Sequence, residues 1–126
     1  MATSIIKAQS IDYIVDQGTS GNWKYRKWNS GRVEAWGYKN FSSIPVTSVS
    51  PTYGGYRSAA LEIAIPSGIF GGTPEQAFIT KVNAQGAAIY CAEPKSATLI
   101  QFYLGGSTSS TTLENQRFNV YCVYGG

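Results

Sequence analysis

The 126-residue sequence contains no histidine, and 13% of its residues are charged, about half the share usual in globular proteins. Without histidine the chain lacks the commonest general base, which excludes Ser-His-Asp and Cys-His catalysis and most zinc sites. No apolar run approaches the ~20 residues that a membrane-spanning helix needs. We therefore expect no metal site and no insertion into a membrane.

The sequence also shows no residue pattern typical of other classes of enzyme. A glycosidase needs two carboxylates about 5–10 Å apart across a cleft, and no two acidic residues here form a pattern that indicates such a pair. No glycine-rich stretch lies between a strand and a helix to hold a phosphate. Cys91 and Cys122 lie in apolar, strand-like runs, which predicts buried thiols and leaves a disulfide between them open. The sequence thus predicts no enzyme, no catalytic residue and no cofactor.

The first residues do not resemble a secretory signal, because Met1-Ala-Thr-Ser is polar and Lys7 follows Ile5-Ile6 at once. We expect synthesis in a cytoplasm and a soluble product. The formal net charge is only +3, and the basic residues are scattered outside one stretch, so no nucleic-acid-binding surface is predicted.

That stretch, residues 21–37, holds all three tryptophans together with a cluster of Lys and Arg residues. Two runs of aromatic and charged residues flank Asn29-Ser-Gly31. This order predicts a hairpin with a three-residue loop, closed by Trp28 and Arg32, in which glycine takes the left-handed conformation.

This loop sets the register of the two strands. It places Arg26 opposite Glu34 as an ion pair that orients the hairpin between Trp28 and Trp36, and it places Lys24 opposite Trp36. The opposite face is apolar enough to belong to the core and carries Trp23, Tyr25, Val33 and Ala35. A well-packed hairpin without any further role is the alternative interpretation.

The rest of the chain predicts an all-β fold. Short alternating runs separated by turn residues indicate about eight strands in an antiparallel β-sandwich or jelly-roll-like domain. We expect residues 1–20 to be an extended lead-in segment or a junction to a shaft, and residues 21–126 to be the head domain. Pro45 limits Tyr38–Val49 to an edge strand, whereas the almost wholly apolar Ala87–Ala92 is predicted to be central.

Two strand-like segments, 97–104 and 116–124, are apolar on both faces. Surplus apolar surface indicates a subunit interface. A closed barrel, or strands central to both layers, would explain the same pattern without one.

The order of residues in the hairpin region resembles a known motif. Asp12-Tyr-Ile-Val-Asp-Gln-Gly-Thr-Ser-Gly21, then Trp23-x-Tyr-Arg-Lys-Trp-x-Ser-Gly31 and Glu34-x-Trp-Gly37, is similar to the C-terminal region of minor structural and tail-fibre proteins of phages and prophages of Gram-positive bacteria. The similarity covers residues 12–37 and departs at Ala35, where the family often has cysteine. It implies a receptor-binding domain in the virion tail, assembled in the host cytoplasm as a homotrimer that contacts other tail proteins.

The composition favours adhesion to a bacterial cell-surface glycan or wall polymer. Aromatic side chains, which include nine tyrosines, stack on the apolar faces of sugars. The candidate ligand-binding residues are Tyr53, Tyr56 and Arg57 in the loop Ser50–Ser58, with Trp28 and Trp36 as a second candidate pair. The loops Ser50–Ser58 and Gly105–Thr112 are the two longest irregular stretches after residue 38. The alternatives are tyrosines that only anchor their loop, a purely structural trimerising domain, and a carbohydrate-binding module of a cell-wall enzyme.

Overall fold

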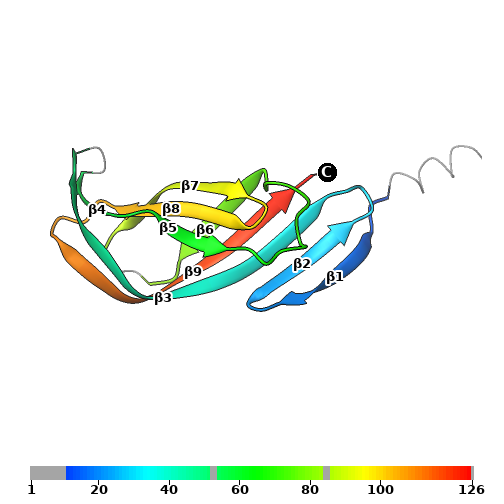
Figure 1. The fold of residues 1–126 in the computed structure, drawn as a ribbon, viewed down its shortest axis with the longest axis horizontal. Helices are drawn as coiled ribbons and strands as arrows, with labels where there is room; N and C mark the ends of the chain where they lie inside the picture. Colours follow the sequence, from blue (N-terminus) through cyan, green and yellow to red (C-terminus); the bar gives the residue numbers. More distant parts are fainter. Residues whose placement is uncertain (1–10, 52–53, 84–85, 126) are drawn as a thin grey trace, which may run out of the picture.

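The computed structural model describes residues 11–51, 54–83 and 86–125, and this part of the chain contains nine strands and no helix. Figure 1 shows an elongated molecule in which β5, β7 and β8 lie over one part of a longer layer. The strands are β1 (Ile14–Ser20), β2 (Trp23–Trp28), β3 (Val33–Ser50), β4 (Gly55–Ser58), β5 (Leu61–Ala64), β6 (Gln76–Lys81), β7 (Ala88–Ser96), β8 (Leu99–Gly105) and β9 (Thr111–Tyr124).

These strands form two antiparallel sheets, so the predicted all-β class is confirmed. The large sheet has the order β1-β2-β3-β9-β6, with β4 also paired to β3, and the small sheet has the order β5-β8-β7. Within the described ranges no helix is long and apolar enough to cross a membrane.

The core lies between the two sheets. Phe102 of β8 packs against Phe118 of β9, with their ring centroids 5.0 Å apart, and Phe41 of β3 meets both rings edge-on. Leu, Ile and Val side chains surround them, and burying each one contributes about 1.5–3 kcal/mol. The alternation of apolar residues along the strands therefore holds the sheets together.

The longest pairing joins β3 to β9 and runs through Pro45, so Tyr38–Val49 belongs to one long strand and is not interrupted at the proline. Around Pro45 this strand has an edge position, as predicted, whereas residues 46–50 also pair with β4. Val33 to Val46 pair with Tyr124 to Thr111, and Pro45 lies opposite Thr112. On its other side β3 meets β2 near one end and β4 near the other. Proline fits because, among the described strands, residues 37–45 pair on the β9 side alone.

The prediction that Ala87–Ala92 forms a central strand is wrong. β7 is an edge strand of the small sheet, and β8 lies in the middle. The register between them shifts twice, and Cys91 has a φ of 53°. Cys91 is consequently exposed, whereas Cys122 on β9 is buried as predicted. Small alanine side chains made this run apolar without giving it enough bulk to occupy the core.

Candidate functional site

The hairpin between β2 and β3 has the predicted loop. The Trp28 amide donates to the Arg32 carbonyl at 2.8 Å, and the Gly31 amide donates to the Trp28 carbonyl at 3.0 Å. Gly31 has a φ of 95°, a conformation that glycine adopts without steric cost. The predicted pairing of Lys24 with Trp36 and of Arg26 with Glu34 is confirmed.

The chain before β1 is tied to this loop. Asp12 accepts hydrogen bonds from the Ser30 hydroxyl at 2.9 Å and the Ser30 amide at 3.2 Å. The Asn29 amide donates to the Tyr13 carbonyl, and the Tyr13 amide donates to Asn29 Oδ1, both at 2.9 Å. β1 then pairs antiparallel with β2, so residues 14–20 belong to the large sheet.

The large sheet has an inner face towards the small sheet and its connections, and an outer face on the other side. On the inner face Trp23 is buried beside Gly37. A Cβ on Gly37 would lie 2.5 Å from the Trp23 ring, so only glycine leaves room for this indole. Val33 and Ala35 are buried and Tyr25 partly so, which confirms the predicted core face of the hairpin.

The outer face carries aromatic side chains from three neighbouring strands. Trp36 of β3 is the cross-strand partner of Tyr121 of β9, and Tyr121 is the partner of Phe78 of β6. Cross-strand neighbours share a face of a sheet, so these three residues form an aromatic row. Strands are ~4.8 Å apart, which makes the row about 10 Å long.

Glu34 lies beside this row and is nearly buried. It accepts hydrogen bonds from the Tyr121 hydroxyl at 2.6 Å and from Trp28 Nε1 at 3.3 Å. Its ion pair is with Arg32 at 3.6 Å. Chiefly because of the hydrogen bond to Glu34, the pKa of Tyr121 is raised above its ordinary value. The carboxylate thus fixes two aromatic side chains on the outer face.

The predicted Arg26–Glu34 ion pair is not formed in the described part of the chain, although the two residues face each other. The Arg26 guanidinium lies over the Trp36 ring, 5.2 Å from its centroid. Register brings the backbones together, but the carboxylate already has better-placed donors and Arg26 packs on the indole.

A second arginine stacks on the neighbouring ring of β3. The Arg117 guanidinium lies 3.8 Å from the centroid of Tyr38, and Arg117 Nε makes a long bond of 3.4 Å to Asn119 Oδ1. Trp36 and Tyr38 are two residues apart on one strand, a separation of about 7 Å. The outer face therefore carries two adjacent aromatic–guanidinium stacks.

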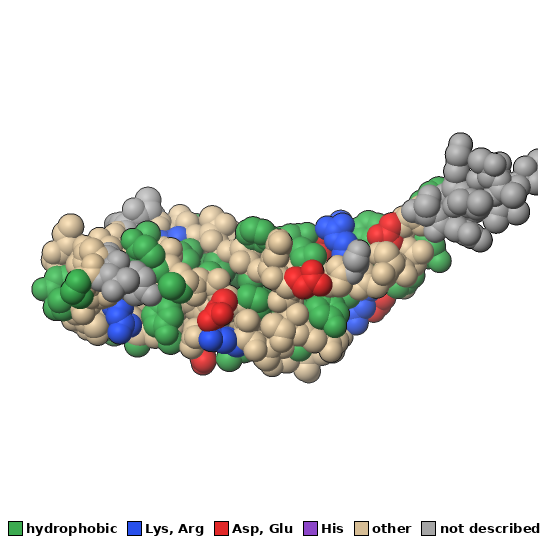
Figure 2. Space-filling view, turned by 90° about the horizontal axis from the view of Figure 1, so that it is seen from above, with side chains coloured by type: hydrophobic (Ala, Val, Ile, Leu, Met, Phe, Trp, Pro, Cys, Tyr) green, Lys and Arg blue, Asp and Glu red, His purple; other side chains and the backbone are tan. Residues whose placement is uncertain are grey.

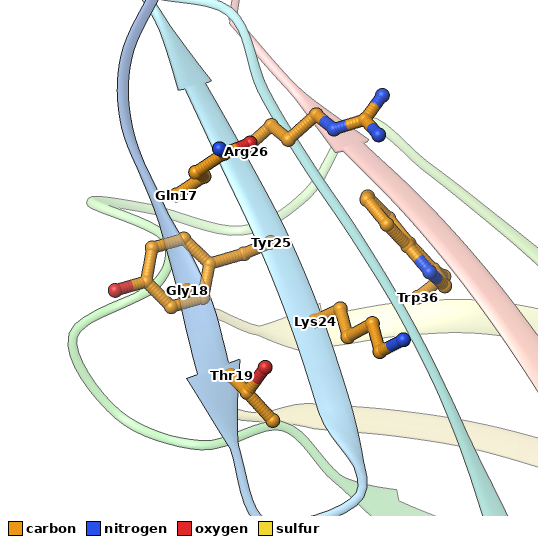
Figure 3. A pocket seen from close by; sticks show the side chains of 7 residues that line it. All are labelled: Gln17, Gly18, Thr19, Lys24, Tyr25, Arg26 and Trp36. Atoms are coloured by element: carbon orange, nitrogen blue, oxygen red, sulfur yellow. The ribbon is translucent and has the colours of Figure 1, made fainter.

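Two open grooves meet at Trp36. The first, of about 330 Å³, runs between β1 and β2 past Gln17, Lys24 and Arg26 to the Trp36 ring. In Figure 3 the Arg26 and Lys24 side chains extend from β2 towards opposite sides of this ring. The second, of about 340 Å³, continues from Trp36 over Tyr38, Arg117 and Asn119. Volumes of this size accommodate small ligands or a few residues of a polymer.

The structure does not place the predicted ligand-binding cluster of Tyr53, Tyr56 and Arg57 in an open loop. Tyr53 lies outside the described residues, and Tyr56 and Arg57 belong to β4 rather than to a loop. Tyr56 packs against the core, and its amide donates to the Ser107 carbonyl at 2.9 Å. Arg57 lies over the Tyr103 ring of the small sheet at 5.9 Å.

Gly55 serves this contact between segments rather than leaving space for a ligand. Its backbone passes so close to the Ser107 carbonyl oxygen that a Cβ would collide with it. The two predicted loops are therefore neighbours, joined through their backbones.

The sequence predicted that Trp28 and Trp36 share one face of the hairpin. It did not predict the other residues of the outer face, which are Tyr38, Phe78, Arg117 and Tyr121. The signal was the alternation in β9, where Arg117, Asn119 and Tyr121 occupy the side opposite the core positions. Nothing local to β9 showed that this side continues the tryptophan face.

Comparisons of the chain with protein-family models, with curated proteins and with solved structures found no match.

Proposed function

We propose that this chain is a receptor-binding domain of a phage tail fibre, located in the virion tail, that attaches to a carbohydrate on a bacterial surface. The outer face carries the proposal, because Trp36, Tyr121 and Phe78 form an aromatic row beside two open grooves. The C–H faces of sugar rings pack on aromatic rings, while their hydroxyls bond to polar side chains such as Asn119.

The tail context rests on the similarity over residues 12–37. Residues of that motif have definite physical roles in the fold. Asp12 ties the preceding chain to Ser30, Gly31 makes the turn, and Glu34 holds two aromatic side chains of the outer face. A motif that builds one face and the approach to it fits a domain displayed at the end of a fibre.

Self-association into a homotrimer is part of the proposal, with other tail proteins as further partners. Exposed apolar side chains support it at both edges of the large sheet, namely Val15 on β1 and Val82 just after β6. Three copies would make weak single sites effective through avidity. Light scattering should give three times the chain mass of 13.6 kDa, and a monomer at high concentration would contradict the trimer.

Binding of the purified domain to intact Gram-positive cells and to isolated cell-wall glycans tests the function. We expect binding to some members of a broad panel, lost in Trp36→Ala and kept in the control Tyr103→Ala. Tyr103 is also an aromatic residue under an arginine, but it lies on the small sheet. Absence of binding across the panel would favour a purely structural trimerising domain.

The same face would serve a carbohydrate-binding module of a cell-wall enzyme. The neighbouring genes distinguish the two, because a fibre domain is encoded among tail genes and a module beside or within a hydrolase.

A further inference from the structure

We infer that the outer face takes a negatively charged glycan, with acidic groups bound by Arg26, Arg117 and Lys24 beside the rings of Trp36 and Tyr38. This inference rests on the proposed function and names the chemistry of the ligand. It follows from three features of the face: the cations, their lack of acidic partners, and the way two of them are held.

The cations converge on one region although they come from distant positions. Arg26 lies opposite Glu34 and Arg117 lies opposite Asn40, so their backbones are separated by six residues along β3. The two side chains lean towards each other, since one lies over Trp36 and the other over Tyr38. Lys24 lines both grooves between them.

Within the described ranges these three cations form no ion pair with an acidic side chain. In residues 11–51, 54–83 and 86–125 the ion pairs within 4 Å are Arg32–Glu34 and Lys95–Glu93. In register, Glu34 is the acidic residue nearest to Arg26 and Lys24, and its oxygens already accept hydrogen bonds from Tyr121 and Trp28. Glu114 is nearer to Arg117, three residues away on β9, but the two form no ion pair within 4 Å. The face therefore presents positive charge that the described part of the protein does not neutralise.

Each guanidinium lies over a ring, and Arg26 and Arg117 are both exposed, so their terminal N–H groups can reach a ligand, although Arg117 Nε already donates to Asn119. A planar guanidinium that covers an aromatic face donates its N–H groups in its own plane, where they match the two oxygens of a carboxylate or a phosphate. Stacking also lowers the rotamer freedom that the arginine loses when it binds. Arg26 and Arg117 are thus held in advance for an acidic group.

A sugar polymer fits this arrangement better than a nucleic acid. Nucleic-acid binding draws most of its affinity from many phosphate contacts, and the whole chain has a net charge of only +3. Figure 2 shows a side of the molecule on which charged side chains are few and dispersed. Three cations beside aromatic rings suit acidic groups spaced along a largely neutral polymer.

The test begins with isolated cell walls of Gram-positive bacteria to which the full chain binds. Their glycans are compared untreated, after reduction of the carboxyl groups, and after removal of phosphate. We expect one of the two treatments to abolish binding and thereby to identify a uronic acid or a phosphate as the acidic group. Binding to the untreated wall should also weaken between 50 and 200 mM salt, because screening opposes charge pairing.

Variants then locate the site. Arg26→Gln and Arg117→Gln should each weaken binding about tenfold, the effect of one lost charge-assisted contact. Arg57→Gln is the matched control, because Arg57 of β4 also lies over an aromatic ring, but that ring is Tyr103 of the small sheet and not part of the outer face. This variant should bind as the parent does.

Each other outcome overturns the inference in a recognisable way. If both treated walls still bind while Trp36→Ala does not, the ligand is neutral and only the proposed function stands. Tighter binding to a mixed-sequence single-stranded oligonucleotide than to any wall would replace the glycan by a nucleic acid. If no wall binds, the proposed function fails together with this inference.

Discussion

Trp23 and Trp36 lie on neighbouring strands of one sheet, yet their surroundings differ completely. Trp23 is on the inner face, 4% exposed, and packs into space that Gly37 leaves empty. Trp36 is on the outer face, half-buried, and carries the guanidinium of Arg26. Trp23 therefore contributes to the core, whereas Trp36 lies on the surface of the sheet.

Successive side chains of a strand face opposite sides of the sheet, so the same residue type has a different role on each face. Inner positions contribute through apolar burial, which acts without direction. Outer positions contribute through directed contacts, such as the bonds that Glu34 accepts from Tyr121 and Trp28.

Truncating the two tryptophans should separate the faces by stability. Trp23→Ala should lower the free energy of unfolding by about 3–5 kcal/mol, because it leaves a cavity against Gly37. Trp36→Ala should lower it by less than ~1 kcal/mol, since its ring is accessible to solvent. Urea denaturation measures both, and equal losses would mean that the outer face also supports the core.

Glu34 should couple strongly to Tyr121 and weakly to the arginines. Double-mutant cycles of Glu34→Gln with Tyr121→Phe should give about 1.5–3 kcal/mol for a bond to a charged acceptor. The cycle with Arg32→Met should give about 0.2–1 kcal/mol, because Arg32 is exposed.

The cycle with Arg26→Met is the control and should give a coupling near zero, since Arg26 packs on Trp36 instead. A coupling with Arg26 larger than that with Tyr121 would restore the ion pair that the register alone predicts.

The Tyr121–Glu34 bond should also appear in the pH dependence. The pKa of Tyr121 is raised above its ordinary 10.0, so the folded state favours the protonated phenol. Its contribution to stability is complete below that ordinary value and is lost as the pH rises through the folded pKa. Denaturation at about pH 9 to 11 should show a steeper loss for the parent than for Tyr121→Phe. Parallel curves would contradict the bond.

The last prediction concerns the chemical reactivity of the two thiols rather than the stability of the fold. Cys122 is on the inner face of β9, and burial raises its pKa to about 12. Below that pH its thiol stays protonated and unreactive. We expect a thiol-specific reagent to modify the exposed Cys91 first and Cys122 only at the rate of unfolding, as mass spectrometry can follow. Simultaneous modification would show that the core opens readily.

The hairpin could be predicted because its information is local. Gly31 permits the left-handed turn, the turn sets the register, and the register decides which of Trp23 and Trp36 faces inwards. The all-β class followed in the same way from alternation and turn residues. Each of these inferences needs only neighbours within a few residues.

The predictions that were wrong concerned features that depend on contacts between segments far apart in the sequence. Glu34 takes its shortest bond from Tyr121, 87 residues later, so its partner was invisible within the hairpin. The edge position of β7 depends on which strands β8 pairs with, and the sequence of Ala87–Ala92 does not indicate that pairing. The strand at Tyr56 forms because β3 and Ser107 supply its partners. Strand order is a long-range property that composition does not carry.

Hydrogen bonds join Asp12 and Tyr13 to the loop at Asn29-Ser30. Gly125 also lies against Gly31, so the described chain approaches and leaves the sheet at the same loop. The described chain is therefore anchored at this loop where it approaches β1 and where it leaves β9. The loop that sets the register between β2 and β3 thus also restricts the movement of the segments next to it, because their hydrogen bonds would have to break first.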